Sequence, residues 1–241
     1  MNGSRGNWKL SNIIRVEVMG EISQQEIRHL YCSLMEEAKV RVGVINLTYS
    51  NESKLPPTIV REICYLQFRF LCEIIALACL AAHSDIKESQ TLKGTYEPGK
   101  IIKRLEKLNP HFYPQPIERA RNTDLQRTTL TIRPDIKHLS RKELPVLWGR
   151  AGDILHRGSM TKVLESEKSA DNNHSDIFDW SEKITGLLNS HWITLVENKK
   201  GMLVTLVTEE TKRTAATIFD FDTGGSSVDL SSTYIADPPP V

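Results

Sequence analysis

Residues 148–158, with the sequence WGRAGDILHRG, combine side-chain types and a spacing that suit anion binding and proton transfer. Arg150 offers a planar set of N–H donors to a phosphate or carboxylate group, and His156, six positions later, can exchange a proton near neutral pH. Gly149 and Gly152 lie inside the same helical pattern, where each glycine costs about 1 kcal/mol relative to alanine. This cost predicts that another helix or a ligand approaches the backbone closely at this point.

The polar residues of this segment fall on one side of a helical projection, and the apolar residues fall on the other side. The apolar face consists of Leu147, Trp148, Ala151, Ile154 and Leu155. Asp153 and Arg157 lie on the polar side, and the Asp153 carboxylate is one turn of helix from each of the three basic groups. Two interpretations remain open: a solvated face with ion pairs inside one helix, and a binding site.

Three charged residues on an earlier apolar helix allow the same two interpretations, a structural role or part of a binding site. Glu62, Arg69 and Glu73 are spaced i, i+7 and i+11, which places them within about 40° of one line on the helix. Charged groups in a protein interior must be paired or hydrogen-bonded, so the line predicts an internal structural network. The alternative is that the line faces Arg150 and His156 and completes one polar cleft with them.

The spacing of this arginine and histidine on a late helix resembles the Arg-x₄₋₆-His signature of the HEPN superfamily. The resemblance covers residues 23–157 in helix order, and Ala151 stands after the arginine where many members have a polar residue. Residues 65–83 and 100–116 are also similar to a group of uncharacterised bacterial proteins, a likeness that implies no activity.

The HEPN resemblance implies an RNA-binding protein or a metal-independent endoribonuclease of a toxin or phage-defence system, often acting as a dimer. The RNA 2′-OH would attack its own phosphate, so the enzyme would only move protons and stabilise charge. His156 would be the general base or acid, Arg150 would bind the phosphate oxygens, and Arg157 would hold the RNA backbone. The other candidate substrate-binding residues are Asp153, Arg69 and Glu73.

A non-catalytic helical interaction or adaptor protein is the alternative from another class. In that case the glycine-bearing helix would pack against a partner protein or a second copy of the chain. The sequence contains no Gly-rich phosphate loop, no HExxH motif and no Cys/His spacing suited to zinc, so we expect neither a cofactor nor a metal site. The expected partners are RNA, a second copy or a partner protein.

The charge is unevenly distributed along a chain whose composition is typical of a soluble globular protein. The 241 residues are 39% hydrophobic and 25% charged, with a net charge of +1. Residues 100–157 hold 13 basic and 6 acidic side chains, whereas residues 158–241 hold 7 basic and 13 acidic ones. Such asymmetry is typical of a polyanion-binding region, of two halves that pair, or of an ordinary solvated surface.

Cysteine usage and hydropathy favour a cytoplasmic protein without a membrane segment. The cysteines form no CxxC pair, which predicts buried free thiols in a reducing compartment. They are Cys32, Cys64, Cys72 and Cys79. The first residues lack the apolar core of a signal peptide. The apolar run 70–82 is too short to span a bilayer and carries Glu73, so it predicts a buried helix.

Apolar periodicity predicts a mainly α-helical fold: a helical bundle with a small C-terminal antiparallel β-meander. The expected helices cover 23–45, 56–82, 99–108, a helix opened by Ser140 and Glu143, and 177–188. The expected strands lie in 192–198, 202–209 and 215–222, with 128–132 as a further short strand. The predicted organisation is an N-terminal arm (1–22), a helical domain (23–190), the β-meander (191–222) and a disordered tail (223–241).

Overall fold

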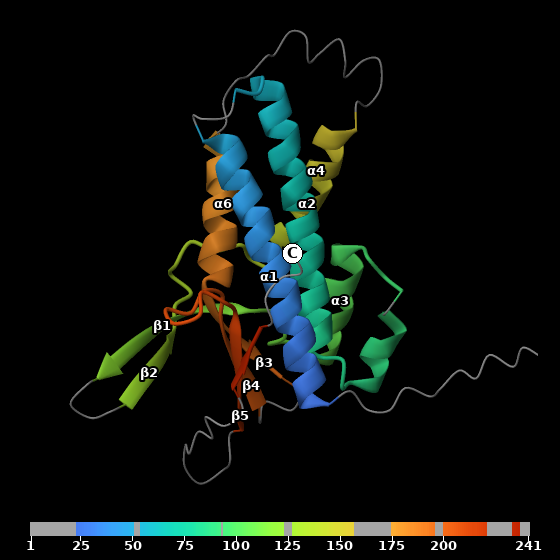
Figure 1. Cartoon of the computed structure of the whole chain (residues 1–241). Helices are drawn as coiled ribbons and strands as arrows, with labels where there is room; N and C mark the ends of the chain where they lie inside the picture. Colours follow the sequence, from blue (N-terminus) through green and yellow to red (C-terminus); the bar gives the residue numbers. More distant parts are fainter. Residues whose placement is uncertain are drawn as a thin grey trace, which may run out of the picture.

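The structure is a computed structural model that describes residues 23–50, 54–92, 94–122, 127–156, 175–195, 200–220 and 233–236. Its helices are α1 (Gln24–Tyr49), α2 (Pro57–Ala82), the 3₁₀ helix η1 (Lys87–Leu92), α3 (Pro98–Leu108), α4 (Glu143–Leu155) and α6 (Ser175–Leu188). Its strands are β1 (Gln115–Asn122), β2 (Arg127–Ile132), β3 (Ser190–Thr194), β4 (Lys200–Thr205), β5 (Ala215–Asp220) and β6 (Thr233–Ile235). This arrangement confirms the predicted class of a mainly helical fold with a small antiparallel β region (Figure 1).

Helix α2 is the centre of the bundle, with α1 on one side and α4 and α3 on the other (Figure 1). Proline in its first turn suits a helix start, because that turn has no intrahelical partner for the missing N–H. The helix is long and apolar enough to cross a membrane, but 67% of its most apolar window is buried inside the protein. All four cysteines are buried and free, as predicted, and three of them lie on this helix.

Helix α1 begins at a capping box formed by Ser23 and Glu26. The Glu26 backbone N–H donates to the Ser23 hydroxyl at 3.2 Å, and the Ser23 N–H donates to the Glu26 carboxylate at 2.7 Å. The helix continues to Tyr49, four residues beyond the predicted end at Ile45. No glycine or proline interrupts those four residues, so the backbone hydrogen bonds continue to Ser50, whose N–H donates to the Asn46 carbonyl.

The sheet is larger than the predicted meander, with strand order β2-β1-β3-β4-β5-β6 and antiparallel pairing throughout. The β1–β2 hairpin comes from the middle of the chain, where the sequence predicted only the short strand 128–132. It joins β3 through the pairs Gln115–Trp192 and Pro116–His191, so the predicted helical domain 23–190 contributes two strands to the sheet.

At the other edge, strand β6 pairs with β5 inside the segment 223–241, which was predicted to be a disordered tail. That prediction is wrong for Thr233–Ile235, because the exposed edge of β5 offers unpaired backbone groups to a short strand. The predicted N-terminal arm, 1–22, lies outside the described residues.

Two buried polar joints connect the helices to the sheet. The Tyr31 hydroxyl of α1 lies 2.8 Å from Nε2 of His191 on β3, and both residues are fully buried. His83, at the end of α2, lies 2.8 Å from the Cys79 carbonyl through Nδ1, while Asn109 donates to the carbonyl of Thr194 on β3. Burial lowers the pKa of His83, so it is an internal hydrogen-bonding residue.

Candidate functional site

One carboxylate, that of Asp176 at the start of α6, joins three helices at the end of the bundle where α4 terminates. Arg150 of α4 reaches Oδ2 of Asp176 through Nη2 at 2.5 Å. Arg61 of α2 forms a bidentate pair with the same carboxylate at 2.9 and 2.6 Å, and the Tyr65 hydroxyl donates to Oδ2 at 2.7 Å. We call these four residues the Asp176 cluster.

The Asp176 cluster carries a net positive charge. Burial of Asp176 raises its pKa, but hydrogen bonds from Arg61 and Tyr65 and the charges of both arginines outweigh burial and leave the pKa below its ordinary value. Burial, together with the hydrogen bond to Asp176, raises the pKa of Tyr65, so its hydroxyl remains a donor. One carboxylate therefore faces two guanidinium groups, and the Arg150 side chain keeps 45% of its surface exposed.

A second cluster connects α2 to α4 through Trp148. The Trp148 Nε1–H donates to the Glu73 carboxylate at 2.8 Å, and the Arg69 guanidinium lies over the Trp148 ring, 4.3 Å from its centroid. A Cβ atom added at Gly152 would lie 3.0 Å from Nη1 of Arg69, so this glycine makes room for the arginine. At Gly149 an added Cβ would meet no atom within 4 Å, so no contact within the described chain requires that glycine.

The structure brings only some of the predicted site residues together. Arg69 and Glu73 contact α4 through Trp148, which the projection had assigned to the apolar face, and not through Arg150. His156 follows the last residue of α4 with extended backbone angles, and its exposed ring has no hydrogen-bond or ion-pair partner within the described ranges. Arg150 points to α6, and no contact among the described residues links the two proposed catalytic groups.

The other predicted residues are placed as follows: Asp153 and Glu62 are exposed on α4 and α2, and Arg157 lies outside the described residues. Sequence reasoning missed Arg61, Tyr65 and Asp176. A signal was present for two of them, because Arg61 and Tyr65 carry polar groups at i and i+4 on a mainly apolar helix.

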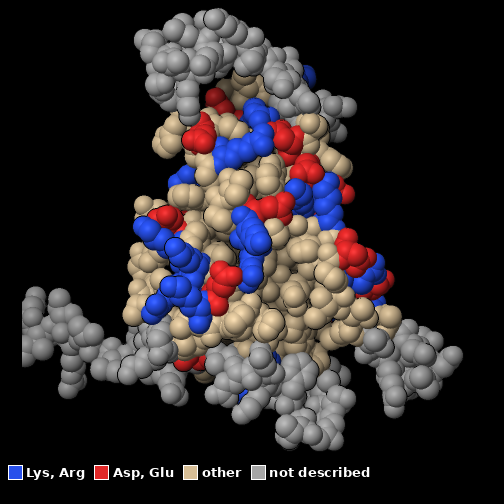
Figure 2. All heavy atoms as spheres, turned by 180° about the vertical axis from the view of Figure 1, so that it is seen from behind, with Lys and Arg blue, Asp and Glu red and all other residues tan. Residues whose placement is uncertain are grey.

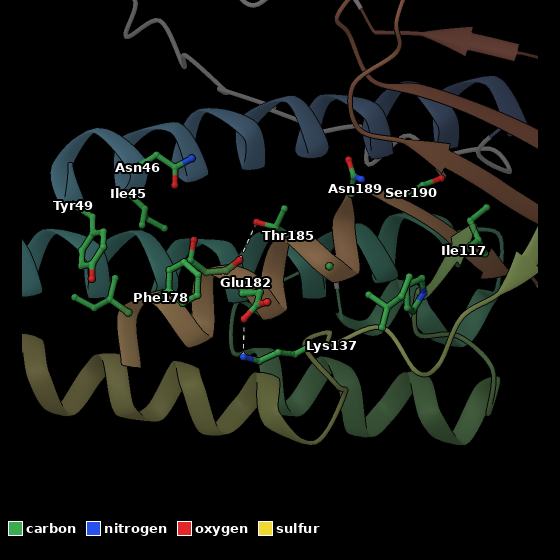
Figure 3. A pocket seen from close by; sticks show the side chains of 15 residues that line it. Ile45, Asn46, Tyr49, Ile117, Lys137, Phe178, Glu182, Thr185, Asn189 and Ser190 are labelled. Carbon is green, nitrogen blue, oxygen red and sulfur yellow. Dashed lines mark hydrogen bonds and ion pairs between the residues drawn. The ribbon is translucent and has the colours of Figure 1, made fainter. Parts of the chain in front are cut away.

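A groove of about 470 Å³ runs between α1 and α6 and ends at β1 (Figure 3). Tyr49 and Phe178 lie at one end, and Ile117 and Ser190 lie at the other. The Ser190 hydroxyl is buried and has no hydrogen-bond partner in the described part of the chain. We call this feature the α1/α6 groove.

Helix α3 presents a row of basic side chains to solvent. Lys100, Lys103, Arg104 and Lys107 are all exposed at positions i, i+3, i+4 and i+7, which places them on one side of the helix. Glu97 pairs with Lys100 at 2.7 Å, whereas the other three cations have no carboxylate partner among the described residues. We call this row the α3 basic stripe. Figure 2 shows lysine and arginine side chains gathered on the side where α3 lies.

A second pocket, of about 460 Å³, lies beside the end of α3. Its wall includes His111, His138 and Arg141, and Arg141 pairs with Glu106 of α3 at 3.1 Å. Across the described ranges, no group of three histidine, cysteine or acidic residues is placed to hold a metal ion. The imidazole rings of His111 and His138 and the guanidinium group of Arg141 thus line a pocket beside the α3 basic stripe.

Comparisons of the chain with protein-family profiles, with characterised proteins and with solved structures found no match.

Proposed function

We propose that the protein binds RNA through the α3 basic stripe. The observation that carries the proposal is that Lys103, Arg104 and Lys107 share one exposed side of α3 without carboxylate partners in the described chain. Several other described cations, among them Lys137, Lys183 and Arg133, are paired with acids. Unpaired cations in a row neutralise backbone phosphates, and release of counterions from the nucleic acid drives such binding.

The surroundings of the stripe favour a nucleic acid over a membrane. A membrane-binding amphipathic helix inserts an apolar face into the lipid, but the apolar face of α3 is buried in the protein. The adjacent pocket, with His111 and His138 in its wall, has a size and chemistry suited to an unstacked base of a single strand. Helix α4 begins beside α3 and leads to Arg150, which lies about 10 Å further along its axis.

Changing Lys103 and Lys107 together to glutamine is expected to weaken binding of a labelled single-stranded RNA about tenfold near 100 mM salt. Two lost phosphate contacts also make the plot of log K against log salt concentration less steep by about 1.4. Fluorescence anisotropy measures both quantities.

The matched control is the double change of Lys54 and Lys212 to glutamine, because these exposed lysines also lack a carboxylate partner in the described chain. Both double variants lower the net charge by two. Equal weakening by the two variants, or wild-type binding by the α3 variant, contradicts a site on α3. Binding to anionic lipid vesicles but not to RNA would assign the stripe to membranes.

Metal-independent cleavage of RNA is the second candidate function. The observations that favour it are the exposed ring of His156, which has no partner within the described residues, and the half-exposed Arg150 six positions earlier in the sequence. With EDTA present, His156→Ala and Arg150→Ala are each expected to lower the cleavage rate at least 100-fold, because general acid–base catalysis and charge stabilisation contribute factors of this order. Gel electrophoresis of the RNA measures the rate.

Equal cleavage by the wild type and both variants, or cleavage by none of them, removes the enzyme hypothesis. If the protein binds RNA and does not cleave it, the result supports an RNA-binding protein without enzymatic activity. If it neither binds nor cleaves RNA, the helical interaction or adaptor protein is the remaining proposal.

A further inference from the structure

Helix α1 exposes an apolar ridge beside the α1/α6 groove. The ridge consists of Val40, Gly43 and Leu47, spaced i, i+3 and i+7, with Val40 57% and Leu47 72% exposed. A Cβ atom added at Gly43 would meet no atom within 4 Å, so nothing in the described chain requires glycine there. Glycine inside a helix costs about 1 kcal/mol, and it permits close approach of another backbone.

The groove beside this ridge is lined by aromatic and aliphatic side chains. Phe178 of α6 is 61% exposed and Tyr49 of α1 is 41% exposed, and both point into the groove (Figure 3). Ile45 and Ile177 line the same groove and are buried. A ridge and a groove thus lie side by side at the C-terminal half of α1, with Asn46 on the helix surface between them.

We propose that a second copy of this chain binds here, so that the α1 ridge of each protomer lies in the α1/α6 groove of its partner. A two-fold axis brings the same patch of both copies together, and such a contact requires a surface that complements itself. The adjacent ridge and groove meet that requirement, since a two-fold rotation presents each to the other. The open glycine lets the two α1 helices approach closely.

The charges around the groove favour an identical partner. Lys137 at the rim pairs with Asp179 at 2.8 Å and with Glu182 at 2.7 Å in its own chain, which leaves few uncompensated charges. The remaining polar lining includes neutral side chains, among them Asn46 and Thr185. Two copies of a nearly uncharged surface can meet without the repulsion that like charges across a two-fold axis produce.

The exposed apolar area is of the size that a dimer interface needs. Val40, Leu47, Tyr49 and Phe178 together leave roughly 400 Å² of side-chain surface exposed, because aromatic side chains carry about 150–250 Å² each. A standard interface buries about 800 Å² per partner, somewhat more than half of it apolar. The largest apolar patch on a typical monomer has about this extent and is often functional, which agrees with an interaction at this place.

Sedimentation velocity of the full chain at micromolar concentration is expected to show a species of twice the monomer mass of 27.4 kDa. Leu47→Glu and Phe178→Lys are each expected to raise the dissociation constant at least about 30-fold, since each places a charge against an apolar surface in both contacts. Both side chains are exposed in one chain, so the thermal unfolding midpoints should stay near that of the wild type.

Mixing the two variants tests the pairing of ridge with groove. In a mixed dimer, one contact places the introduced carboxylate at position 47 against the introduced ammonium group at position 178, and the other contact keeps the native leucine and phenylalanine. The mixture should therefore form dimers at concentrations where each variant alone is monomeric. Loss of dimers by both variants without recovery in the mixture overturns the ridge-to-groove pairing.

The matched control is Val146→Glu, which puts the same charge on an exposed valine of α4, a helix that packs against α2 and α3, and should leave the dimer intact. A wild type that stays monomeric at about 100 µM, some hundredfold above a micromolar dissociation constant, or a dimer that neither variant weakens, overturns the proposal. Tight binding of another protein to a monomer would assign the groove to that partner. The proposal is independent of RNA binding, which anisotropy of the same variants reports separately.

Discussion

Gly186→Ala is expected to lower the free energy of unfolding by about 3 kcal/mol or more, because overpacking of a tight contact costs about 1–3 kcal/mol, and more where the backbone must shift. A Cβ atom added at this position of α6 would overlap the carbonyl oxygen of Lys137 and lie 3.2 Å from its carbonyl carbon. The obstacle is backbone, and the Leu139 N–H holds this segment to α6 by donating to the Lys183 carbonyl at 2.8 Å. Urea denaturation measures the change.

Gly149→Ala is the control, because it makes the same substitution in another helix with the opposite surroundings. An added Cβ at Gly149 meets no atom within 4 Å, so alanine should raise the free energy of unfolding by about 0.5–1 kcal/mol. Destabilisation of similar size at both positions would show that the close approach of Lys137 to α6 is not what requires Gly186.

The helices could be predicted because their signals are local. The Ser23–Glu26 capping box opens α1, and Pro57 in the first turn opens α2. Ser140 and Glu143 also exchange the predicted capping hydrogen bonds, at 3.0 Å and 3.3 Å, although the helical backbone of α4 begins only at Glu143. Each signal acts within one turn of helix, so the sequence alone carries it.

The β1–β2 hairpin could not be predicted with the same certainty, because its place depends on a distant partner. The prolines at 110, 114 and 116 favour extended backbone, but nothing local shows that Pro116 would pair with His191. Strand propensity depends on neighbours across the sheet more than helix propensity depends on packing. The same reason applies to β6, whose three residues are a strand only beside β5.

The candidate site shows the same limit. A helical projection places Arg150 on the polar face of α4, but it cannot show that Asp176 of α6 lies within reach. Likewise the alternative in which Arg69 and Glu73 face the polar side of α4 does not hold, because both residues contact Trp148. The indole of Trp148 is an apolar ring that also carries a hydrogen-bond donor, so a division of residues into polar and apolar classes does not predict its bond to Glu73.

The pKa difference of His191 between the folded and unfolded states is expected to lower the free energy of unfolding by about 3 kcal/mol as the pH falls from about 6.5 to about 4. The ring is fully buried, and burial lowers its pKa to about 4. The pKa in the unfolded chain is about 6.5, so between these values the unfolded state binds the proton and the folded state does not. Stability is therefore complete above about pH 6.5, falls as the pH is lowered, and levels off below about pH 4.

Comparison with His191→Gln isolates this effect from carboxyl groups such as Asp176, whose lowered pKa also costs stability in acid. Glutamine cannot take up a proton, and its amide oxygen can accept the hydrogen bond from the Tyr31 hydroxyl. The variant should be less stable than the wild type at about pH 7.5, and the difference should shrink or reverse by about pH 4.5. Urea unfolding at several pH values measures the difference between the two proteins. The difference in the free energy of unfolding between wild type and His191→Gln could instead stay constant with pH. That result would mean that water reaches the His191 ring in the folded protein. The Tyr31–His191 hydrogen bond would then not be the dry connection between helix and sheet that the burial of both residues indicates.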